Sequence, residues 1–241
     1  MPPLGEVLRS SVGKKLVSGL TGLLLSGFVV AHLVGNLLLL VGQEAFNEYA
    51  YFLEHFGHGY AVYLAEVGLI AIFLFHAVSG IQVALDRRRA RSSRYQKSVS
   101  AGGSSRLTLA SRSMIVTGTV LLLFVPLHVA MFKYGVAAET VHMTTVDGEP
   151  FRDLYRLVVD WFSHGPTVAA YVAVMLLLGT HLRHGFWSAF QSLGATNPRY
   201  MPLIHGVGIA FAVAIAFGFL FIPVYMFLFV GPTGIGSMVA G

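Results

Sequence analysis

The sequence predicts an all-α membrane protein, a bundle of five transmembrane helices that forms one domain over residues 1–241. Three observations lead to this prediction. The chain is 55% hydrophobic and 11% charged, which is too apolar for an ordinary soluble domain. Its apolar residues gather in five stretches, and each of them reaches the roughly 20 residues that a helix needs to cross a bilayer. The loops between these stretches alternate between basic and acidic.

The first span is predicted to be retained rather than cleaved. Arg9, Lys14 and Lys15 precede an apolar run, as they would in a signal peptide. The run is too long for a cleaved core, however, and no small-residue cleavage site follows it. Residues 1–16 then form a short amphipathic lead-in. The five predicted spans are approximately 17–41, 61–85, 113–134, 166–190 and 205–230.

The loops give the orientation of the bundle. The loop at 42–60 is acidic and aromatic, the loop at 86–112 is strongly basic, and the loop at 135–165 is mainly acidic. The last connection, 191–204, is short and contains Pro198 and Pro202 as expected helix breakers. By the positive-inside rule the N-terminus and the 86–112 and 191–204 loops are cytoplasmic.

Charge and cysteine content exclude several classes of function. The net charge of +5 comes from basic residues in loops between apolar runs, so membrane topology explains it better than nucleic-acid binding does. The chain has no cysteine, which excludes disulfides, thiolate zinc sites and iron–sulfur clusters held by this chain.

Four histidines within the spans are the candidate functional residues. At 1.5 Å per residue, His32 and His128 lie about 22 and 21 Å from the inner ends of their spans, and His76 and His181 about 14 Å. The depths predict an outer pair, His32 with His128, and an inner pair, His76 with His181. Two imidazoles that face each other across a bundle core suit the two axial positions of a haem iron.

Glycines on the same helices suit a flat macrocycle. Gly80 and Gly185 each follow an inner-pair histidine by four residues, and a glycine there lets a ring lie against the backbone. Gly22 and Gly118 each precede an outer-pair histidine by ten residues, about three helical turns.

Simpler interpretations of these residues remain open. A histidine in a membrane helix also serves as a hydrogen-bonding group between helices, and small residues also serve as packing sites. A histidine-lined transporter or ion pathway without haem is the alternative function, because intramembrane histidines also form proton or metal relays.

Several sequence motifs resemble those of one known family. They are AHLVGNL, FHAVSG, SRLTLASRSMIVTGTVLLLFVPLHV, DLYRLVVDWF and HLRHGFWSAFQSLG. In this order they resemble the cytochrome b558 subunit of succinate dehydrogenase and fumarate reductase, the five-helix, two-haem membrane anchor of complex II. The similarity extends over nearly the whole chain.

The resemblance implies two haem b groups, menaquinone as electron partner, and a bacterial inner membrane. It implies flavoprotein and iron–sulfur subunits on the cytoplasmic side, with this chain as the quinone-reacting subunit. The family's four axial ligands fall on His32, His76, His128 and His181. Nothing in the chain resembles a flavin or dicarboxylate site.

Further site residues are expected at the ends of the spans. Haem propionates need cationic or hydroxyl partners, and Ser111, Arg112, Arg183 and His184 are the candidates for the inner haem. For Arg112, the role of a positive-inside anchor is equally plausible.

Two places are candidates for the quinone. Glu66 is the acidic residue that lies well inside a span, near the expected level of the outer haem, and proton exchange with a quinone would give it a role there. A neutral Glu66 bonded to a neighbouring helix is the structural alternative. The competing quinone site is at the inner haem, where His205 would approach Arg112 and His184.

Overall fold

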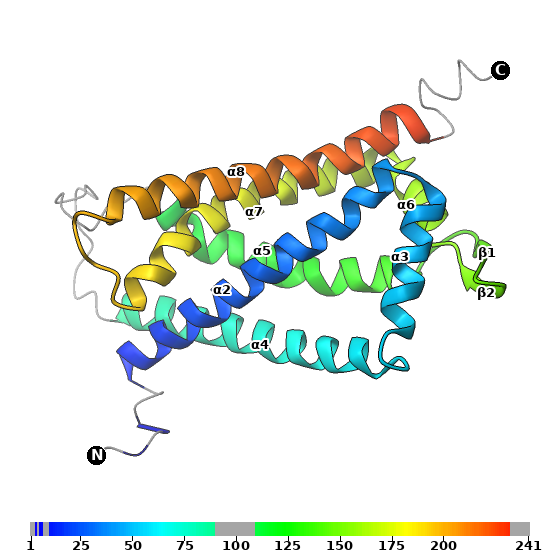
Figure 1. Ribbon diagram of the computed structural model, residues 1–241. Coiled ribbons are helices and arrows are strands. Elements are labelled where there is room, and N and C mark those ends of the chain that lie inside the picture. The colour runs from blue at the N-terminus through cyan, green and yellow to red at the C-terminus, as the bar shows by residue number, and fades with distance from the viewer. Residues whose placement is uncertain (1–2, 4, 7–9, 90–108, 232–241) are drawn as a thin grey trace. The chain divides into compact units, whose positions relative to one another are not determined.

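The protein is described by a computed structural model that covers residues 3, 5–6, 10–89 and 109–231, without side chains for 109–112. In this part of the chain, helices account for nearly all regular structure, and the predicted all-α class is confirmed (Figure 1). The long helices are α2 (Ser11–Asn36), α4 (Tyr60–Arg89), α5 (Leu109–Phe132), α7 (Gly165–Ser192) and α8 (Met201–Tyr225).

Five helical segments within the described residues are long and apolar enough to cross a membrane. Large apolar side chains cover their surfaces: Leu64 is 74% exposed and Val67 67% exposed. Such a surface is unfavourable in water and favourable against lipid tails. The chain is therefore a multi-pass membrane protein. The segments are Ser11–Leu40, Tyr60–Arg89, Ser113–Phe132, Gly165–Ser192 and Met201–Val230.

Several helix ends differ from the predicted spans. α2 already begins at Ser11 and continues into the short 3₁₀ helix η1 (Leu37–Leu40). α8 begins at Met201, so the expected helix breaker Pro202 lies in its first turn. A proline is tolerated there because the first N–H groups of a helix have no partner within the helix. A short π-helical turn, η2 (Met226–Val230), ends the last span.

The contacts divide the chain into two compact units. Unit 1 consists of residues 1–28, 68–119 and 178–213, and unit 2 of residues 29–67, 120–177 and 214–241. Each of the five long helices contributes one part to each unit. The His76–His181 pair belongs to unit 1, and the His32–His128 pair belongs to unit 2.

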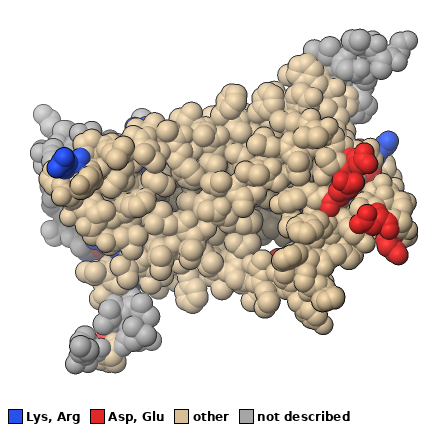
Figure 2. All heavy atoms as spheres, in the orientation of Figure 1, with Lys and Arg blue, Asp and Glu red and all other residues tan. Residues whose placement is uncertain are grey.

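Unit 2 contains short elements that the sequence did not predict. They are helix α3 (Gln43–His55), a hairpin of β1 (Met143–Val146) and β2 (Glu149–Arg152), and helix α6 (Leu154–Phe162). α3 and α6 contact each other. Figure 2 shows acidic side chains gathered over these elements, and the exposed ones include Glu44, Glu48, Glu54, Asp147, Glu149 and Asp160.

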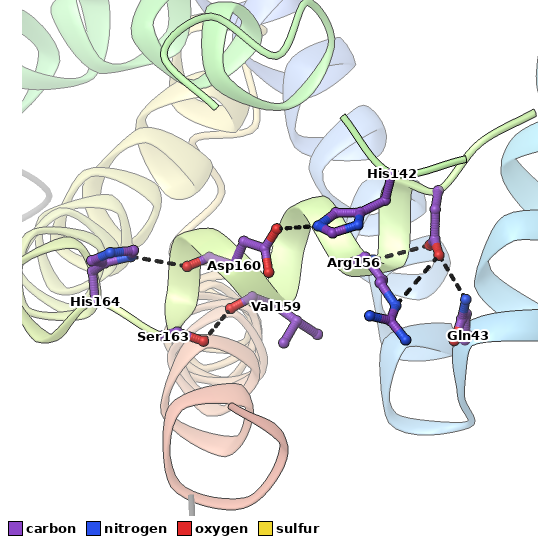
Figure 3. A network of polar contacts seen from close by, with 8 residues as sticks. Gln43, His142, Arg156, Val159, Asp160, Ser163 and His164 are labelled. Atoms are coloured by element: carbon purple, nitrogen blue, oxygen red, sulfur yellow. Dashed lines mark hydrogen bonds and ion pairs between the residues drawn. The ribbon is translucent and has the colours of Figure 1, made fainter. Parts of the chain in front are cut away.

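A buried carboxylate joins α3 to α6. Asp153 is 2% exposed and caps the N-terminus of α6 by accepting a hydrogen bond from Arg156 N at 3.0 Å. It also accepts from Gln43 Nε2 at 2.6 Å and Asn47 Nδ2 at 2.8 Å, both on α3. Close by, His142 Nε2 lies 2.9 Å from Asp160 Oδ2 and ties the start of the hairpin to α6 (Figure 3).

The apolar core of unit 2 lies between these short elements and the long helices. Leu39, Val158, Phe162 and Met226 are among its buried members, and Met226 has no exposed surface. Tyr171 of α7 belongs to the same core. The core therefore surrounds a tyrosine whose hydroxyl group needs a hydrogen-bond partner, because a buried hydroxyl without one is costly.

Candidate functional site

In unit 1, α4 and α7 bring His76 and His181 together. The centroids of the two imidazole rings are 6.2 Å apart and the ring planes are inclined by 75°. These are the two histidines that the depth estimate paired.

Neighbouring groups bind the Nδ1 atoms of this pair. His76 Nδ1 lies 3.1 Å from the carbonyl oxygen of Ser18 and 3.4 Å from Thr21 Oγ1. A carbonyl oxygen can only accept, so Nδ1 of His76 carries the proton and Nε2 keeps its lone pair.

His181 is held in the same way. Its Nδ1 lies 3.1 Å from Thr117 Oγ1. The Thr117 hydroxyl donates to the carbonyl oxygens of Ser113 and Met114, at 3.1 and 3.2 Å. Its oxygen therefore accepts from the Nδ1–H of His181, and Nε2 of His181 also keeps its lone pair.

Two of the predicted glycines lie against this pair, not against the pair for which they were predicted. A Cβ atom on Gly22 would lie 3.0 Å from His76 Cε1, and one on Gly118 would lie 3.3 Å from His181 Cε1. The sequence had related Gly22 to His32 and Gly118 to His128 because each pair shares a helix. The correction arises because a glycine makes room for the residue of a neighbouring helix, which spacing along its own helix does not reveal.

The other two glycines have open space beside them. A Cβ atom on Gly185 would meet nothing within 4 Å, and one on Gly80 would meet only Ser18 Oγ at 4.0 Å. Both positions lie one turn from a histidine of the pair. A flat group bound by that histidine would find room there.

In unit 2, His32 of α2 and His128 of α5 form the second pair. Their ring centroids are 5.8 Å apart and their planes are inclined by 86°. The His128 ring also packs against Phe124 and Phe132 of its own helix, with centroids 5.5 and 5.1 Å away. The ring of Phe219 lies 5.8 Å from that of His32. The pair is thus enclosed by aromatic side chains.

A hydroxyl group again binds Nδ1 of one member. His128 Nδ1 lies 3.0 Å from the hydroxyl oxygen of Tyr171. Tyr171 is 8% exposed, and its own O–H is directed at Met131 Sδ at 3.9 Å. On His32, the Asn36 amide nitrogen lies 3.4 Å from Nδ1 and donates to the His32 carbonyl oxygen at 2.8 Å.

Both pairs have dimensions that suit a shared metal ion. A metal–imidazole bond is about 2.0 Å long, so two imidazoles on opposite sides of one metal have ring centroids about 6 Å apart. The separations of 6.2 and 5.8 Å match this value. Ligating histidines characteristically donate their second N–H to a protein acceptor, as His76 and His181 do.

Each pair offers two protein nitrogen ligands. In the described part of the chain, no group of three or more His, Cys, Asp or Glu side chains could hold a metal ion. A haem iron needs only two protein ligands, because the macrocycle supplies the other four. The residues of both pairs fit a bis-histidine haem.

A further polar cluster in unit 1 contains His184 and His205. The Trp187 ring packs against His205 at a tilt of 36°, with centroids 4.5 Å apart, and lies edge-on to His184 at 5.3 Å. Nδ1 of His184 is buried without a hydrogen-bond partner among the described residues. In the tautomer that carries its proton on Nδ1, His184 would suit an acceptor oxygen such as that of a haem propionate.

The remaining candidates for the inner haem are exposed or lie outside the described side chains. Arg183 is exposed. Ser111 and Arg112 lie in the first turn of α5, but their side chains are outside the described residues, as is most of the basic 86–112 loop. Within that loop, Arg87, Arg88 and Arg89 form the exposed last turn of α4.

Glu66 has a partner that the sequence did not predict. Its carboxylate forms an ion pair with the ammonium group of Lys133, which follows the end of α5. The Glu66 side chain is 32% exposed. Glu66 is thus only partly buried, and its carboxyl group pairs with a cationic side chain.

The residues that bind the imidazoles were missed by sequence reasoning. Thr117, Thr21 and Tyr171 each lie on a different helix from the histidine that they contact. No spacing along one helix could reveal them, since the contact depends on how two helices face each other.

Comparisons with family models, curated proteins and solved structures give no match to this chain. The two histidine pairs and the sequence motifs are therefore the features that bear on its function.

Proposed function

We propose that the chain is the dihaem cytochrome b membrane anchor of a succinate:menaquinone oxidoreductase or fumarate reductase. In this role it passes electrons between an iron–sulfur subunit and menaquinone. The dicarboxylate chemistry belongs to the partner subunits, and this chain is the quinone-reacting subunit of the complex.

One observation carries the proposal. Two histidine pairs, one in each unit, have ring centroids 6.2 and 5.8 Å apart. In each pair at least one Nδ1 atom meets an oxygen of the protein, at 3.0–3.1 Å. A histidine that serves only to join helices has no need of a second imidazole at this distance.

The residues of each unit have distinct tasks in this proposal. His76 and His181 hold one haem, and His32 and His128 hold the other. When bound, each haem takes up and releases single electrons. Gly22 and Gly118 leave room for the His76 and His181 rings, and the aromatic side chains around His128 exclude water. A fixed, dry setting lowers the reorganisation that accompanies each change of charge.

The partners and the membrane follow from the resemblance, and the side on which the partners bind follows from the topology. The membrane is a bacterial inner membrane, and the flavoprotein and iron–sulfur subunits bind on the cytoplasmic side. Arg87, Arg88 and Arg89 end α4 on that side, and the basic residues of 86–112 and the 191–204 connection complete the docking surface. His76 and His181 would hold the haem that is the first to exchange electrons with the iron–sulfur subunit.

For menaquinone, we keep both sites that the sequence suggests. Glu66 is the outer candidate, and its ion pair with Lys133 gives it a charged neighbour at an exposed position. His205, packed against Trp187 beside the unpartnered Nδ1 of His184, is the inner candidate.

A spectrum of the purified chain tests the proposal. A dithionite-reduced-minus-oxidised difference spectrum should show a b-type α-band, with two haems per chain. His76→Ala or His181→Ala should remove one haem, and His32→Ala or His128→Ala should remove the other. If His76→Ala and His128→Ala depleted the same spectroscopic centre, the pairing would be wrong.

The same experiment distinguishes the proposed haem anchor from the alternative function, a transporter or ion pathway. A transporter or ion pathway would use the four histidines as a relay and would yield a colourless protein. A haem-to-protein ratio of one would indicate an anchor that has lost one of the two sites.

A further inference from the structure

In both units, α5 and α7 supply the same two kinds of group: one helix supplies a histidine and the other a hydroxyl group that contacts it. In unit 1, α5 supplies the hydroxyl of Thr117 and α7 supplies His181. In unit 2, α7 supplies the hydroxyl of Tyr171 and α5 supplies His128. Each helix thus carries one histidine and the hydroxyl that binds the other helix's histidine.

Each hydroxyl group has another acceptor within reach of its own proton. Thr117 is 2% exposed, and its proton is directed at the carbonyl oxygens of Ser113 and Met114. Tyr171 is enclosed by Phe124, Phe132 and Phe162, with ring centroids 5.1, 6.0 and 5.1 Å away. Met131 Sδ lies 3.9 Å from its oxygen and can accept its proton. Both oxygens are therefore left as acceptors for an imidazole N–H.

We propose that Thr117 and Tyr171 are the positioning residues of the two iron sites and that each sets the reduction potential of its own haem separately. The inference rests on the proposed function. Each hydroxyl oxygen accepts the Nδ1–H of its histidine, holds that tautomer and leaves Nε2 for the iron. A hydrogen bond from Nδ1–H raises the basicity of the ligating nitrogen and so favours the oxidised, more positive iron.

Substitution of each hydroxyl tests the inference. Tyr171→Phe keeps the ring in its aromatic surroundings and removes the acceptor, so the midpoint potential of the His32–His128 haem should rise and that of the other haem should not change. Thr117→Val should raise the potential of the His76–His181 haem alone. Spectroelectrochemical titration of the purified protein measures both, and electron paramagnetic resonance reports the ligand orientation at each iron.

Two further variants complete the test. Thr117→Ser keeps a hydroxyl and should restore the potential that Thr117→Val shifts. Thr119→Val is the matched control, because the Thr119 hydroxyl bonds to the Ile115 carbonyl oxygen at an exposed position of the same helix. It should shift neither potential.

The outcomes distinguish this inference from the proposed function. Wild-type protein without haem would contradict the proposed function itself. Wild-type protein with two haems, but with potentials that Tyr171→Phe and Thr117→Val leave unchanged or shift together, would overturn the inference alone. Should Thr117→Val lose its haem, retention of both haems by Thr117→Ser would support the positioning role and loss in both variants would overturn it.

Discussion

At the scale of single residues, the Asp153 side chain accepts three hydrogen bonds from groups outside the spans. Its Oδ1 accepts from Asn47 Nδ2 and from Arg156 N, and its Oδ2 accepts from Gln43 Nε2. All three partners are donors, so a carboxylate satisfies them fully. The side chain is 2% exposed, and water cannot replace a lost bond.

Asp153→Asn should therefore destabilise unit 2. An amide group places one N–H₂ where an acceptor is needed, which loses at least one hydrogen bond and leaves a buried donor unsatisfied, at a cost of about 1–3 kcal/mol. The apparent unfolding temperature in detergent, measured at one scan rate, should fall.

Asp147→Asn is the matched control for this substitution. Asp147 is exposed on the hairpin turn with φ 51°, a conformation that asparagine tolerates well. An equal fall in the two variants would show that the contacts of Asp153 contribute nothing of their own.

Single residues also show where sequence reasoning ends. Polar groups inside apolar spans are rare enough to be noticed, and the spacing of the spans gave the depths of the four histidines. The depth pairing of His32 with His128 and of His76 with His181 matches the contacts in the structure. The sequence alone does not show which residues of two helices contact each other. It therefore relates Gly22 and Gly118 to the histidines of their own helices, whereas the structure places them against His76 and His181. For the same reason it does not single out Thr117 and Tyr171.

At the scale of elements, the ion pair of Glu66 and Lys133 joins α4 to the end of α5. Arg152 of β2 lies at the same helix end and donates to the carbonyl oxygens of Phe132 and Lys133, at 3.0 and 2.6 Å. A guanidinium at a helix C-terminus satisfies carbonyl groups that have no partner within the helix. Lys133 thus belongs to a helix terminus that is already fixed.

Substituting each member of the ion pair in turn distinguishes a role of Glu66 in quinone chemistry from a purely structural role. In the assembled complex, Glu66→Gln should lower menaquinone turnover by about 100-fold, as loss of a positioned proton-exchange group does. Haem reduction by succinate should persist. Lys133→Met removes the same ion pair but keeps the carboxylate, and it should largely preserve turnover.

Equal losses in Glu66→Gln and Lys133→Met would show that the pair serves structure alone. Undiminished turnover in Glu66→Gln, with both haems retained, would direct the search for the quinone to His205 and His184.

The five long helices are predicted well from the sequence, whereas the short elements α3, α6 and the hairpin are not. The five spans were found because an apolar run of about 20 residues or more is typical of a membrane-spanning helix, and their ends were correct to within about a turn or two. α3, α6 and the hairpin were read as loops. Each is short and mixes polar with apolar residues, and their contacts with one another and with the long helices stabilise them more than local propensity does.

At the scale of the whole molecule, basic and acidic residues are concentrated in different connections between the spans. The last turn of α4 carries Arg87, Arg88 and Arg89, whereas the exposed charges of α3 are acidic. The positive-inside rule depends on Lys and Arg near the ends of spans, and it predicts that the end of α4 is cytoplasmic and that the hairpin is outside.

The absence of cysteine from the chain makes this orientation directly testable. A single introduced cysteine is the unique thiol, so labelling reports one position. Asp147→Cys, on the exposed hairpin turn, should react with a membrane-impermeant maleimide in intact spheroplasts. Arg88→Cys, exposed at the end of α4, should react only after permeabilisation, because the membrane separates it from the reagent.

The unaltered chain provides the control, since it should not be labelled under either condition. Reaction of Arg88→Cys before permeabilisation, with protection of Asp147→Cys, would reverse the orientation. A reversed orientation would also put the His76–His181 pair on the side away from the cytoplasm. The proposed entry of electrons from a cytoplasmic iron–sulfur subunit would then have to be at His32 and His128, so this labelling decides which haem is reduced first.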